Sequence, residues 1–162
     1  MENIRRVSPD DTEAICAIYN HYVKNSCISF EEESVTTLEM SRRIIDVTES
    51  LPWLVMESEG VVDGYAYATK WRARSAYRFA VEISVYLSQT SIGKGYGTNL
   101  YLNLIDDLSA LGVHTVIAGI SLPNDKSIKL HEKMGLKKVA HFEQVGFKNQ
   151  QWIDVGYWQK TL

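Results

Sequence analysis

The feature that most constrains the fold is a glycine-rich segment that joins a strand-like run to a helix-like run. Gly93, Gly95 and Gly97 occupy alternate positions in it. Residues 81–87 before it alternate apolar and polar side chains, as a half-buried strand does. Residues 98–111 after it repeat apolar side chains at helical spacing and are followed by Gly112, which suits a helix C-terminus. A strand, a glycine loop and a helix in this order indicate an α/β fold.

The glycine loop leaves a stretch of backbone free of side chains. Successive N–H groups in such a loop can close around an anion, and the N-terminus of the following helix adds a positive partial charge. The loop therefore predicts a binding site for a phosphorylated cofactor. The alternative is a turn that only reverses the chain, but such a turn rarely needs three glycines directly before a helix.

Two common nucleotide-binding patterns fail at specific positions. A dinucleotide fingerprint places its third glycine where Thr98 stands, and it needs an acidic residue after the next strand, residues 115–120, which end without one. A P-loop needs Ser or Thr directly after its lysine, but Gly95 follows Lys94. The cofactor is therefore expected to be neither a dinucleotide nor a P-loop nucleotide.

The other segments read as strands and helices in the order β-α-α-β-β-β-α-β-α-β-β, which is typical of an α/β domain with a mixed sheet. Strands are expected at residues 4–7, 53–57, 61–69, 81–87, 115–120, 137–145 and 152–159. Helices are expected from Ser8-Pro9 onward and at residues 36–50, 98–111 and 126–134. No linker, repeat or low-complexity segment interrupts them, so residues 1–162 are expected to form one domain.

Composition and charge disfavour several classes of protein. The formal net charge of -3 offers no broad basic field for a nucleic acid. No apolar stretch approaches the roughly 20 residues of a membrane helix. The first residues lack the basic and apolar regions of a secretory leader, so Cys16 and Cys27 are expected to be reduced thiols in a cytoplasmic protein.

The pattern x-x-x-G-x-G at residues 92–97 resembles the pyrophosphate loop of the GNAT superfamily of N-acetyltransferases, which bind acetyl-coenzyme A. The resemblance extends from about Ile4 to Leu162 and is to the phosphinothricin acetyltransferase family within that superfamily. It is carried by residues 71–77, 82–87, 122–125, 130–132, 146–148, 152–155 and 158–159. Ile92 departs from the superfamily, which usually has Arg or Gln there, so one side-chain donor to the pyrophosphate is missing. Lys94 can offset part of that charge.

The resemblance implies a GNAT-type domain with a mixed sheet of about seven strands, splayed near Val85–Leu87 and flanked by four helices. It also implies acetyl-coenzyme A as co-substrate, no metal, and a homodimer, for which the aromatic C-terminal segment with Trp152, Tyr157 and Trp158 offers an interface or simply core packing. Relatives in the family acetylate the α-amine of amino-acid-like compounds such as phosphinothricin, methionine sulfoximine and methionine sulfone. Two further hypotheses stay open: acetylation of protein N-termini or lysines, and a non-catalytic acyl-coenzyme A sensor.

Several residues are expected to bind the cofactor because the resemblance carries the superfamily's contacts onto them. The strand end would pair with the pantetheine arm, Asn124 would bond the arm and Lys133 the 3′-phosphate. Ordinary sheet pairing, a helix cap at Asn124 and a solvated Lys133 are the simpler alternatives. The expected set is Val85, Tyr86, Leu87, Gly93, Lys94, Gly95, Tyr96, Gly97, Thr98, Asn124 and Lys133.

Glu82 is the expected general base. A carboxylate partly buried in a strand otherwise built from apolar and small residues would have a raised pKa, which suits proton abstraction near neutral pH. The alternatives are a charge on a solvated face or one paired with Arg72 or Arg74; the family resemblance favours the base. His131 is expected either to protonate the leaving sulfur or only to contact the cofactor, although a lone His on a helix is often structural.

The acceptor's carboxylate is expected to meet arginines, because guanidinium groups bind carboxylates bidentately. Arg72, Arg74 and Tyr77 are assigned to the acceptor's carboxylate and side-chain oxygens. Trp71 and Phe30 are assigned to the walls of the pocket. Solvated arginines near a turn are the alternative.

Overall fold

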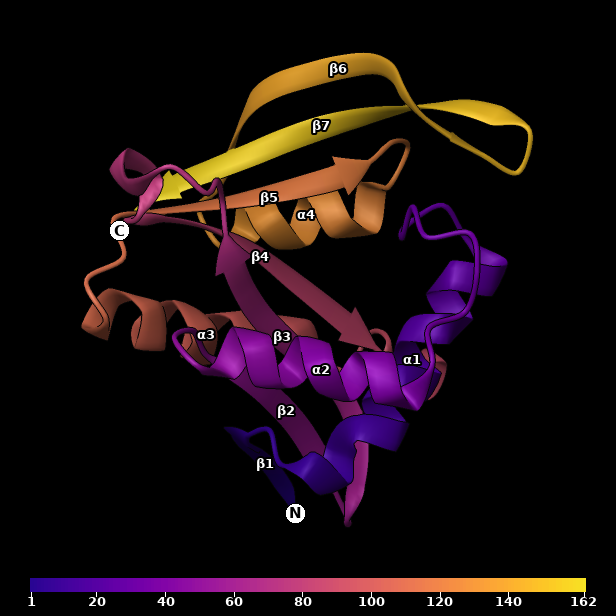
Figure 1. Cartoon of the computed structure of the whole chain (residues 1–162), viewed down its shortest axis with the longest axis vertical. Helices are drawn as coiled ribbons and strands as arrows, with labels where there is room; N and C mark the ends of the chain where they lie inside the picture. The colour runs from indigo at the N-terminus through magenta and orange to yellow at the C-terminus, as the bar shows by residue number, and fades with distance from the viewer.

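A mixed sheet of seven strands, in the order β1-β2-β3-β4-β5-β7-β6, runs through the molecule (Figure 1). This computed structural model describes residues 1–162. The strands are β1 Glu2–Arg6, β2 Trp53–Ser58, β3 Val61–Lys70, β4 Ala80–Leu87, β5 Thr115–Ser121, β6 Lys137–Lys148 and β7 Gln151–Thr161. Only β4 and β5 pair in parallel; every other neighbouring pair is antiparallel.

Four α-helices flank the sheet: α1 Thr12–Asn25, α2 Thr37–Thr48, α3 Tyr96–Ala110 and α4 Asp125–Lys133. The predicted order of elements and the fold class are confirmed. Most predicted boundaries differ from the observed ones by one or two residues, and two wrong boundaries matter here. Helix α3 begins at Tyr96 rather than Thr98, because Gly95 takes the N-cap position and Gly97 is accommodated within the first turn.

The second wrong boundary lies in the last hairpin. Strand β6 continues to Lys148, and only Asn149 and Gln150 form the turn before β7. Both turn residues have positive φ, 53° and 59°, which is the geometry of a two-residue hairpin turn whose twist matches the strands. Neither residue is glycine, so the sequence lacks the usual signal for this turn.

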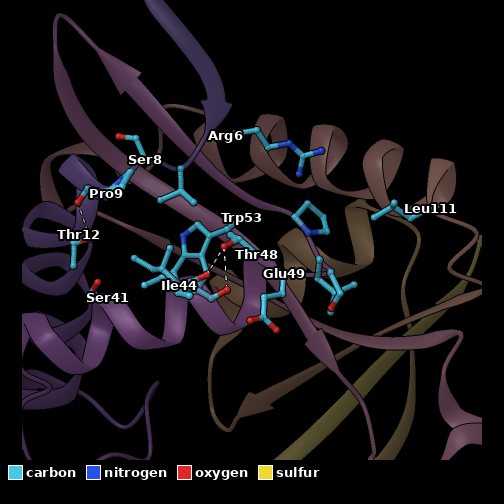
Figure 2. A pocket seen from close by; sticks show the side chains of 15 residues that line it. Arg6, Ser8, Pro9, Thr12, Ser41, Ile44, Thr48, Glu49, Trp53 and Leu111 are labelled. Atoms are coloured by element: carbon cyan, nitrogen blue, oxygen red, sulfur yellow. Dashed lines mark hydrogen bonds between the residues drawn. The ribbon is translucent and has the colours of Figure 1, made fainter.

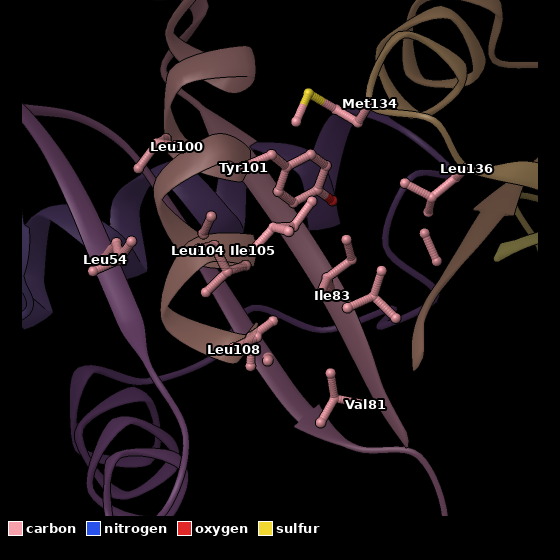
Figure 3. Close-up of a cluster of buried hydrophobic side chains, with 14 of the residues drawn as sticks. Leu54, Val81, Ile83, Leu100, Tyr101, Leu104, Ile105, Leu108, Met134 and Leu136 are labelled. Carbon is pink, nitrogen blue, oxygen red and sulfur yellow. The ribbon is translucent and has the colours of Figure 1, made fainter. Parts of the chain in front are cut away.

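The helices bury the two faces of the sheet separately. Side chains of α3 and α4 pack on one face around Tyr101, Leu104 and Leu108, which are fully buried (Figure 3). Helices α1 and α2 cover part of the other face. Strand β2 shows the alternation that makes this possible, because Leu54 faces the first cluster and Trp53 the second.

The sheet opens between its two central strands. Strands β4 and β5 pair only at Ala80 with Thr115, Val81 with Val116 and Glu82 with Ile117. Beyond Glu82 the strands diverge, as Figure 1 shows, while β4 stays paired with β3 as far as Leu87. The predicted splay near Val85–Leu87 is confirmed, and the β5-facing edge of residues 83–87 has no strand partner.

None of the helices combines the length and the apolar character that crossing a membrane requires.

Candidate active site

The divergence of β4 from β5 opens a passage through the sheet. On the side of α1 and α2 it widens into a cavity of about 460 Å³ that contains Glu82. Toward α3 and α4 it narrows to about 60 Å³ beside Asn124 and His131. The two parts share Ile28, Ser84, Tyr86, Gly119 and Ser121 as lining residues, so they are compartments of one cleft. Two reactants can therefore approach the same point from opposite faces of the sheet.

Glu82 lies in the wide compartment without a partner. Its carboxylate forms no hydrogen bond or ion pair, and burial raises its pKa while the charge of Arg72 partly opposes that effect. A Cβ atom placed on Gly119 of β5 would lie 3.4 Å from Glu82 Oε1 and 3.1 Å from the Tyr157 ring. Glycine at this position therefore keeps space open beside the carboxylate. A half-buried carboxylate without a cation partner is able to accept a proton near neutral pH.

His131 lies in the narrow compartment with both ring nitrogens engaged. Nδ1 lies 2.6 Å from the Ser127 carbonyl oxygen, which only accepts, so Nδ1 carries the proton. Nε2 lies 3.0 Å from the hydroxyl of Tyr101 on α3 and accepts from it in the neutral ring. Burial lowers the pKa of His131, and the bond to Ser127 opposes this only in part. The ring is therefore neutral at pH 7, and Tyr101 joins the site as a residue that sequence analysis missed.

The glycine loop presents unpaired backbone N–H groups. Gly93 and Gly95 have φ values of 87° and 85°, in the left-handed region that favours glycine. The first backbone hydrogen bond of α3 runs from Asn99 N to Gly95 O, 3.1 Å. The N–H groups of Tyr96, Gly97 and Thr98 therefore have no acceptor within the helix. Together with the helix dipole they form the anion cradle expected from the sequence, although they belong to the first turn of α3 and not to a loop.

The residues around this loop make different contacts. Gly97 allows close packing, because a Cβ there would lie 3.3 Å from Leu130 of α4. The Tyr96 hydroxyl turns away to Glu2, 2.9 Å, so only its backbone faces the cradle. The Lys94 side chain is exposed and passes 5.7 Å from the Tyr96 ring.

A buried aspartate, Asp63, forms hydrogen bonds with the segment between β4 and the glycine loop. The Asp63 carboxylate accepts hydrogen bonds from Ser91 Oγ, 2.6 Å, and from the Ser58 hydroxyl, and the Asp63 carbonyl accepts from Ser88 N, 2.8 Å. Burial alone would raise the pKa of Asp63, but these hydroxyls lower it overall. Sequence analysis missed this support, because Asp63 and Ser91 are 28 positions apart and no motif connects them.

The remaining residues predicted for the cofactor occupy three places. Asn124 is the N-cap of α4 and accepts from Ser127 N, 3.2 Å, while also lining the narrow compartment. Val85 and Tyr86 line the compartment too, and Leu87 uses its carbonyl to accept from the Tyr22 hydroxyl at 2.5 Å. Lys133 is exposed at the end of α4.

The residues predicted for the acceptor are only partly brought together. Phe30 lines the wide compartment with Glu82. The Arg72 guanidinium stacks 4.6 Å from the centre of the Trp71 ring, and Trp71 meets Tyr157, a lining residue, edge to face at 5.6 Å. Trp71 thus lies behind the lining, whereas Arg72, Arg74 and Tyr77 are exposed and outside it.

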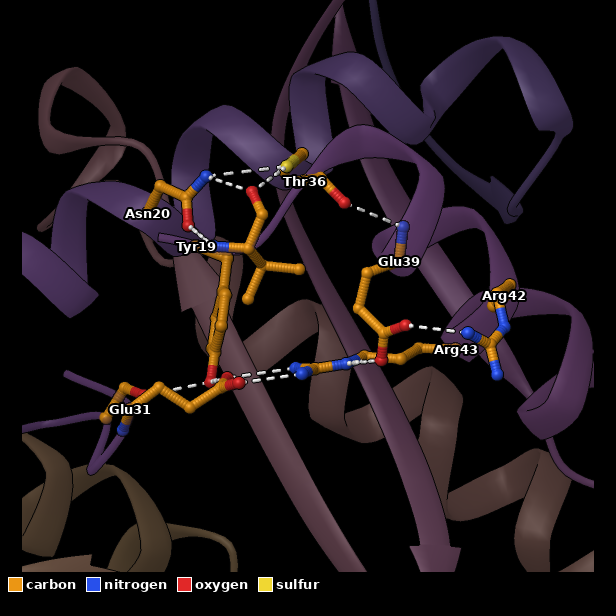
Figure 4. A network of polar contacts seen from close by, with 10 residues as sticks. Tyr19, Asn20, Glu31, Thr36, Glu39, Arg42 and Arg43 are labelled. Atoms are coloured by element: carbon orange, nitrogen blue, oxygen red, sulfur yellow. Dashed lines mark hydrogen bonds and ion pairs between the residues drawn. The ribbon is translucent and has the colours of Figure 1, made fainter. Parts of the chain in front are cut away.

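A polar network that sequence analysis missed holds the segment carrying Phe30 (Figure 4). The Arg43 guanidinium donates to both oxygens of Glu31, at 2.9 and 2.6 Å. The Tyr19 hydroxyl donates to the same carboxylate and bonds Ser29 Oγ at 2.8 Å. These bonds, first of all those from Arg43, keep the pKa of Glu31 below its usual range. Glu31 therefore lines the cleft as an ionised carboxylate whose charge is balanced by Arg43.

A larger cavity lies elsewhere. It measures about 510 Å³ and is bounded by the start of α1, α2, the segment before β2 and Leu111 (Figure 2). Its lining includes Arg6, Glu49 and Trp53 but no residue of the splayed strands. The cleft at the splay is therefore the candidate active site despite its smaller size, because it holds the unpaired Glu82 carboxylate, and the end of β4 at Leu87 packs close to Gly97 in the first turn of α3, which carries the anion cradle. No group of three His, Cys, Asp or Glu side chains is arranged to hold a metal ion.

A splayed mixed sheet with an anion cradle at the strand-to-helix junction defines an acetyltransferase fold, and the chain belongs to the GNAT acetyltransferases. The model of the acetyltransferase (GNAT) domain matches residues 4–156. The chain is 41% identical over 159 residues to phosphinothricin N-acetyltransferase of Streptomyces viridochromogenes, covering 98% of this chain and 87% of that protein. It is 36% identical over 164 residues to L-methionine sulfoximine/L-methionine sulfone acetyltransferase of Salmonella typhimurium, covering 98% and 94%. The chain is therefore an acyltransferase.

Solved structures agree with this assignment. A GNAT superfamily phosphinothricin acetyltransferase from Sinorhizobium meliloti, in complex with acetyl-coenzyme A, superposes with a TM-score of 0.96 at 36% identity, covering 99% of this chain and 88% of that one. A ribosomal-protein-alanine N-acetyltransferase from Brucella melitensis gives 0.97 at 34% identity, covering 99% of both chains. The fold is thus shared by proteins named for different acceptors.

Proposed function

We propose that this chain transfers the acetyl group of acetyl-coenzyme A to the α-amine of a small amino-acid-like acceptor, of the phosphinothricin, methionine sulfoximine or methionine sulfone type. The observation that carries the proposal is the unpaired Glu82 carboxylate, which lies in the wide compartment beside Gly119, a residue that this compartment shares with the narrow passage. The names of the relatives support the acceptor class.

The residues present fit acetyl-coenzyme A. The free N–H groups of α3's first turn suit a pyrophosphate, with the backbone of Gly93–Gly95 completing the cradle. The unpaired edge of β4 after Glu82 offers backbone groups to the pantetheine arm, and one of its N–H groups would polarise the thioester carbonyl. Asn124 and Lys133 remain proposed contacts to the arm and to the 3′-phosphate.

Glu82 would act as the general base in a direct transfer. The acceptor's ammonium gives one proton to the Glu82 carboxylate, directly or through a water, and that proton passes to solvent. The neutral nitrogen then forms the bond to the thioester carbon, and the carbon–sulfur bond breaks. The sulfur leaves as a thiolate and takes up the second proton lost by the nitrogen, so that an amide and a free thiol result. No covalent enzyme intermediate is needed.

The catalytic role predicted for His131 stays a prediction. A proton supplied by His131 would leave from Nε2, since Nδ1 is bonded to the Ser127 carbonyl. Nε2 faces the Tyr101 hydroxyl, so the proton would reach the sulfur by way of Tyr101 or after that bond breaks. The alternative role, a neutral ring that positions Tyr101 in the thioester passage, requires no change of protonation.

Acceptor recognition is proposed to use a charge close to the cleft. Arg72 is the arginine whose charge acts on Glu82, so it is the first candidate for the acceptor's carboxylate. Phe30 would be one wall, with Trp71 supporting Tyr157 behind the other. Arg74 and Tyr77 are proposed to meet side-chain oxygens of the acceptor from outside the lining.

A cytoplasmic homodimer is also proposed. The β6–β7 hairpin exposes Phe142, Val145, Phe147 and Trp152, each at least half exposed, which is a typical composition for an interface. Trp158 does not contribute, because it is buried in the core. Sedimentation of the purified chain would test the assembly.

The experiment that tests the proposal measures release of free thiol from acetyl-coenzyme A. Phosphinothricin, methionine sulfoximine and methionine sulfone are compared with a peptide bearing an N-terminal alanine, since the similarity to a ribosomal-protein-alanine acetyltransferase favours that second candidate. Turnover with the small acceptors supports the proposal, and turnover with the peptide alone overturns it. Calorimetric binding of acetyl-coenzyme A without turnover on a broad amine panel would favour the sensor.

A further inference from the structure

The segment between α1 and α2 forms one wall of the wide compartment. Ile28, Ser29, Phe30 and Glu31 all line it, opposite Glu82. The segment has no helix or strand of its own over residues 26–36, so its position depends on contacts with the rest of the molecule. The position of this wall sets the size of the compartment, and the groups that hold the wall therefore bear on how an acceptor fits.

Lys148 is the only buried lysine of the chain, with an exposed fraction of 3%. Its Nζ donates to the Ser29 carbonyl at 2.7 Å and to the Val23 carbonyl at 2.8 Å. Both of its acceptors are backbone carbonyls, and its charge also helps to lower the pKa of Glu31 after the larger effect of Arg43. The last residue of β6 thus reaches 119 positions back along the chain to hold the wall at Ser29 and the end of α1 at Val23.

Burying an ammonium group is costly unless its hydrogen bonds are satisfied. The Val23 carbonyl lies in the last turn of α1, where no helical N–H follows to pair with it, so a cation there also complements the helix dipole. An apolar side chain of the same length would fill the space but leave both carbonyls unpaired. The two bonds therefore hold the wall in place and do more than fill a gap.

Two further contacts join the same hairpin and the same wall. A Cβ atom on Gly146 would lie 2.5 Å from the Phe30 ring, so the ring packs directly on the β6 backbone. Asn149, in the hairpin turn, contacts Cys27 Sγ at 3.8 Å. From the opposite side, Arg43 holds Glu31 through two hydrogen bonds. The wall is thus held between the β6–β7 hairpin and α2.

We propose that Lys148 is a positioning residue for the acceptor site: its buried ammonium holds residues 26–31 against the β6–β7 hairpin and so sets the wall that carries Phe30. The inference rests on the proposed function, because it takes the wide compartment to be the place of the acceptor. It assigns to Lys148 no contact with either substrate. Of residues 26–31 only Ile28 also lines the narrow compartment, so the acetyl-coenzyme A side should depend on Lys148 much less.

The test compares Lys148→Met with Lys137→Met, a change of an exposed lysine on the same strand. In Lys148→Met the KM for the acceptor should rise about tenfold, because two hydrogen bonds from a charged donor are lost. The KM for acetyl-coenzyme A should stay within about twofold, and backbone amides of residues 26–31 should exchange hydrogen faster than in the wild type. Lys137→Met should match the wild type in all three measurements.

Unchanged hydrogen exchange and an unchanged acceptor KM in Lys148→Met would overturn the proposal. An equal rise in KM for the acceptor and for acetyl-coenzyme A would also overturn it. If that variant does not fold, Gly146→Ala is measured instead, because its methyl group displaces the Phe30 ring. A raised KM for the acceptor with an unchanged KM for acetyl-coenzyme A supports the proposal. Wild-type kinetics overturn it. Hydrogen exchange separates this result from the proposed function. If the wild type shows no turnover, the proposed function is wrong. Amide hydrogen exchange at residues 26–31 still shows in that case whether Lys148 holds the wall.

Discussion

Replacing Glu82 with glutamine should lower activity and raise stability, and both effects should depend on pH. Glutamine keeps the shape of the side chain but cannot accept the acceptor's proton. It also removes a carboxylate that is half-buried without a hydrogen bond or ion pair. The two effects have one cause, since the burial that raises the pKa of Glu82 also penalises its charged form.

The sign of the stability effect follows from the raised pKa. Below the pKa of an unfolded glutamate the side chain is neutral in both states and costs nothing. As pH rises through the higher folded pKa, the folded state must ionise a half-buried group, and the free energy of unfolding falls below its value at low pH. Glu82→Gln should therefore be more stable than the wild type near pH 8 and similar near pH 4. Because the group is only partly buried, the gain should be on the order of 1 kcal/mol, or about 2–4 °C in Tm for a chain of this size.

The kinetic effect should be larger. Removing a general base should lower kcat by about 10² to 10⁴, with little change in the Kd for acetyl-coenzyme A. In the wild type, kcat/KM should rise with pH through a pKa above that of a free glutamate, and this limb should vanish in the variant. Thiol release measures the rates, and calorimetric scans at the two pH values measure Tm. Wild-type activity in Glu82→Gln, or a variant less stable than the wild type at pH 8, would refute the reasoning.

Three further changes probe the rest of the cleft. Ile92→Arg adds the donor that the loop lacks and should tighten acetyl-coenzyme A binding about five- to tenfold by calorimetry; an unchanged Kd would show that the backbone cradle is sufficient. Gly119→Ala places a methyl group 3.4 Å from Glu82 Oε1 and 3.1 Å from the Tyr157 ring, and should lower kcat/KM for the acceptor about tenfold while Tm changes little; full activity would argue against this position for the reacting groups. Asp63→Ala leaves Ser91 Oγ without its 2.6 Å acceptor and should raise the KM for acetyl-coenzyme A several-fold more than that for the acceptor; equal effects on both would indicate a general loss of stability.

The candidate site was predicted unevenly from the sequence. Glu82, the glycine loop and Phe30 were named from local patterns and family resemblance; the structure places Glu82 and Phe30 in the lining of the cleft and Gly97 close to Leu87 at the end of β4. Tyr101, Asp63 and the residues that hold the wall were not named. Each of them acts through a partner far along the chain, such as Tyr101 with His131, 30 positions away. No periodicity or motif signals such a pair, because it arises only when separate elements pack.

The sequence by itself determined the order of the strands and helices and the glycines at the strand-to-helix junction. These features depend on residues close together: alternation along a strand, helical repeats, and the positive φ that Gly93 and Gly95 adopt. Only the tertiary structure decided where β4 and β5 stop pairing, and with that the position of the cleft. It also decided that the ammonium of Lys148 is buried and holds the wall opposite Glu82. Strand register and burial depend on how distant segments pack together, which a local pattern does not specify.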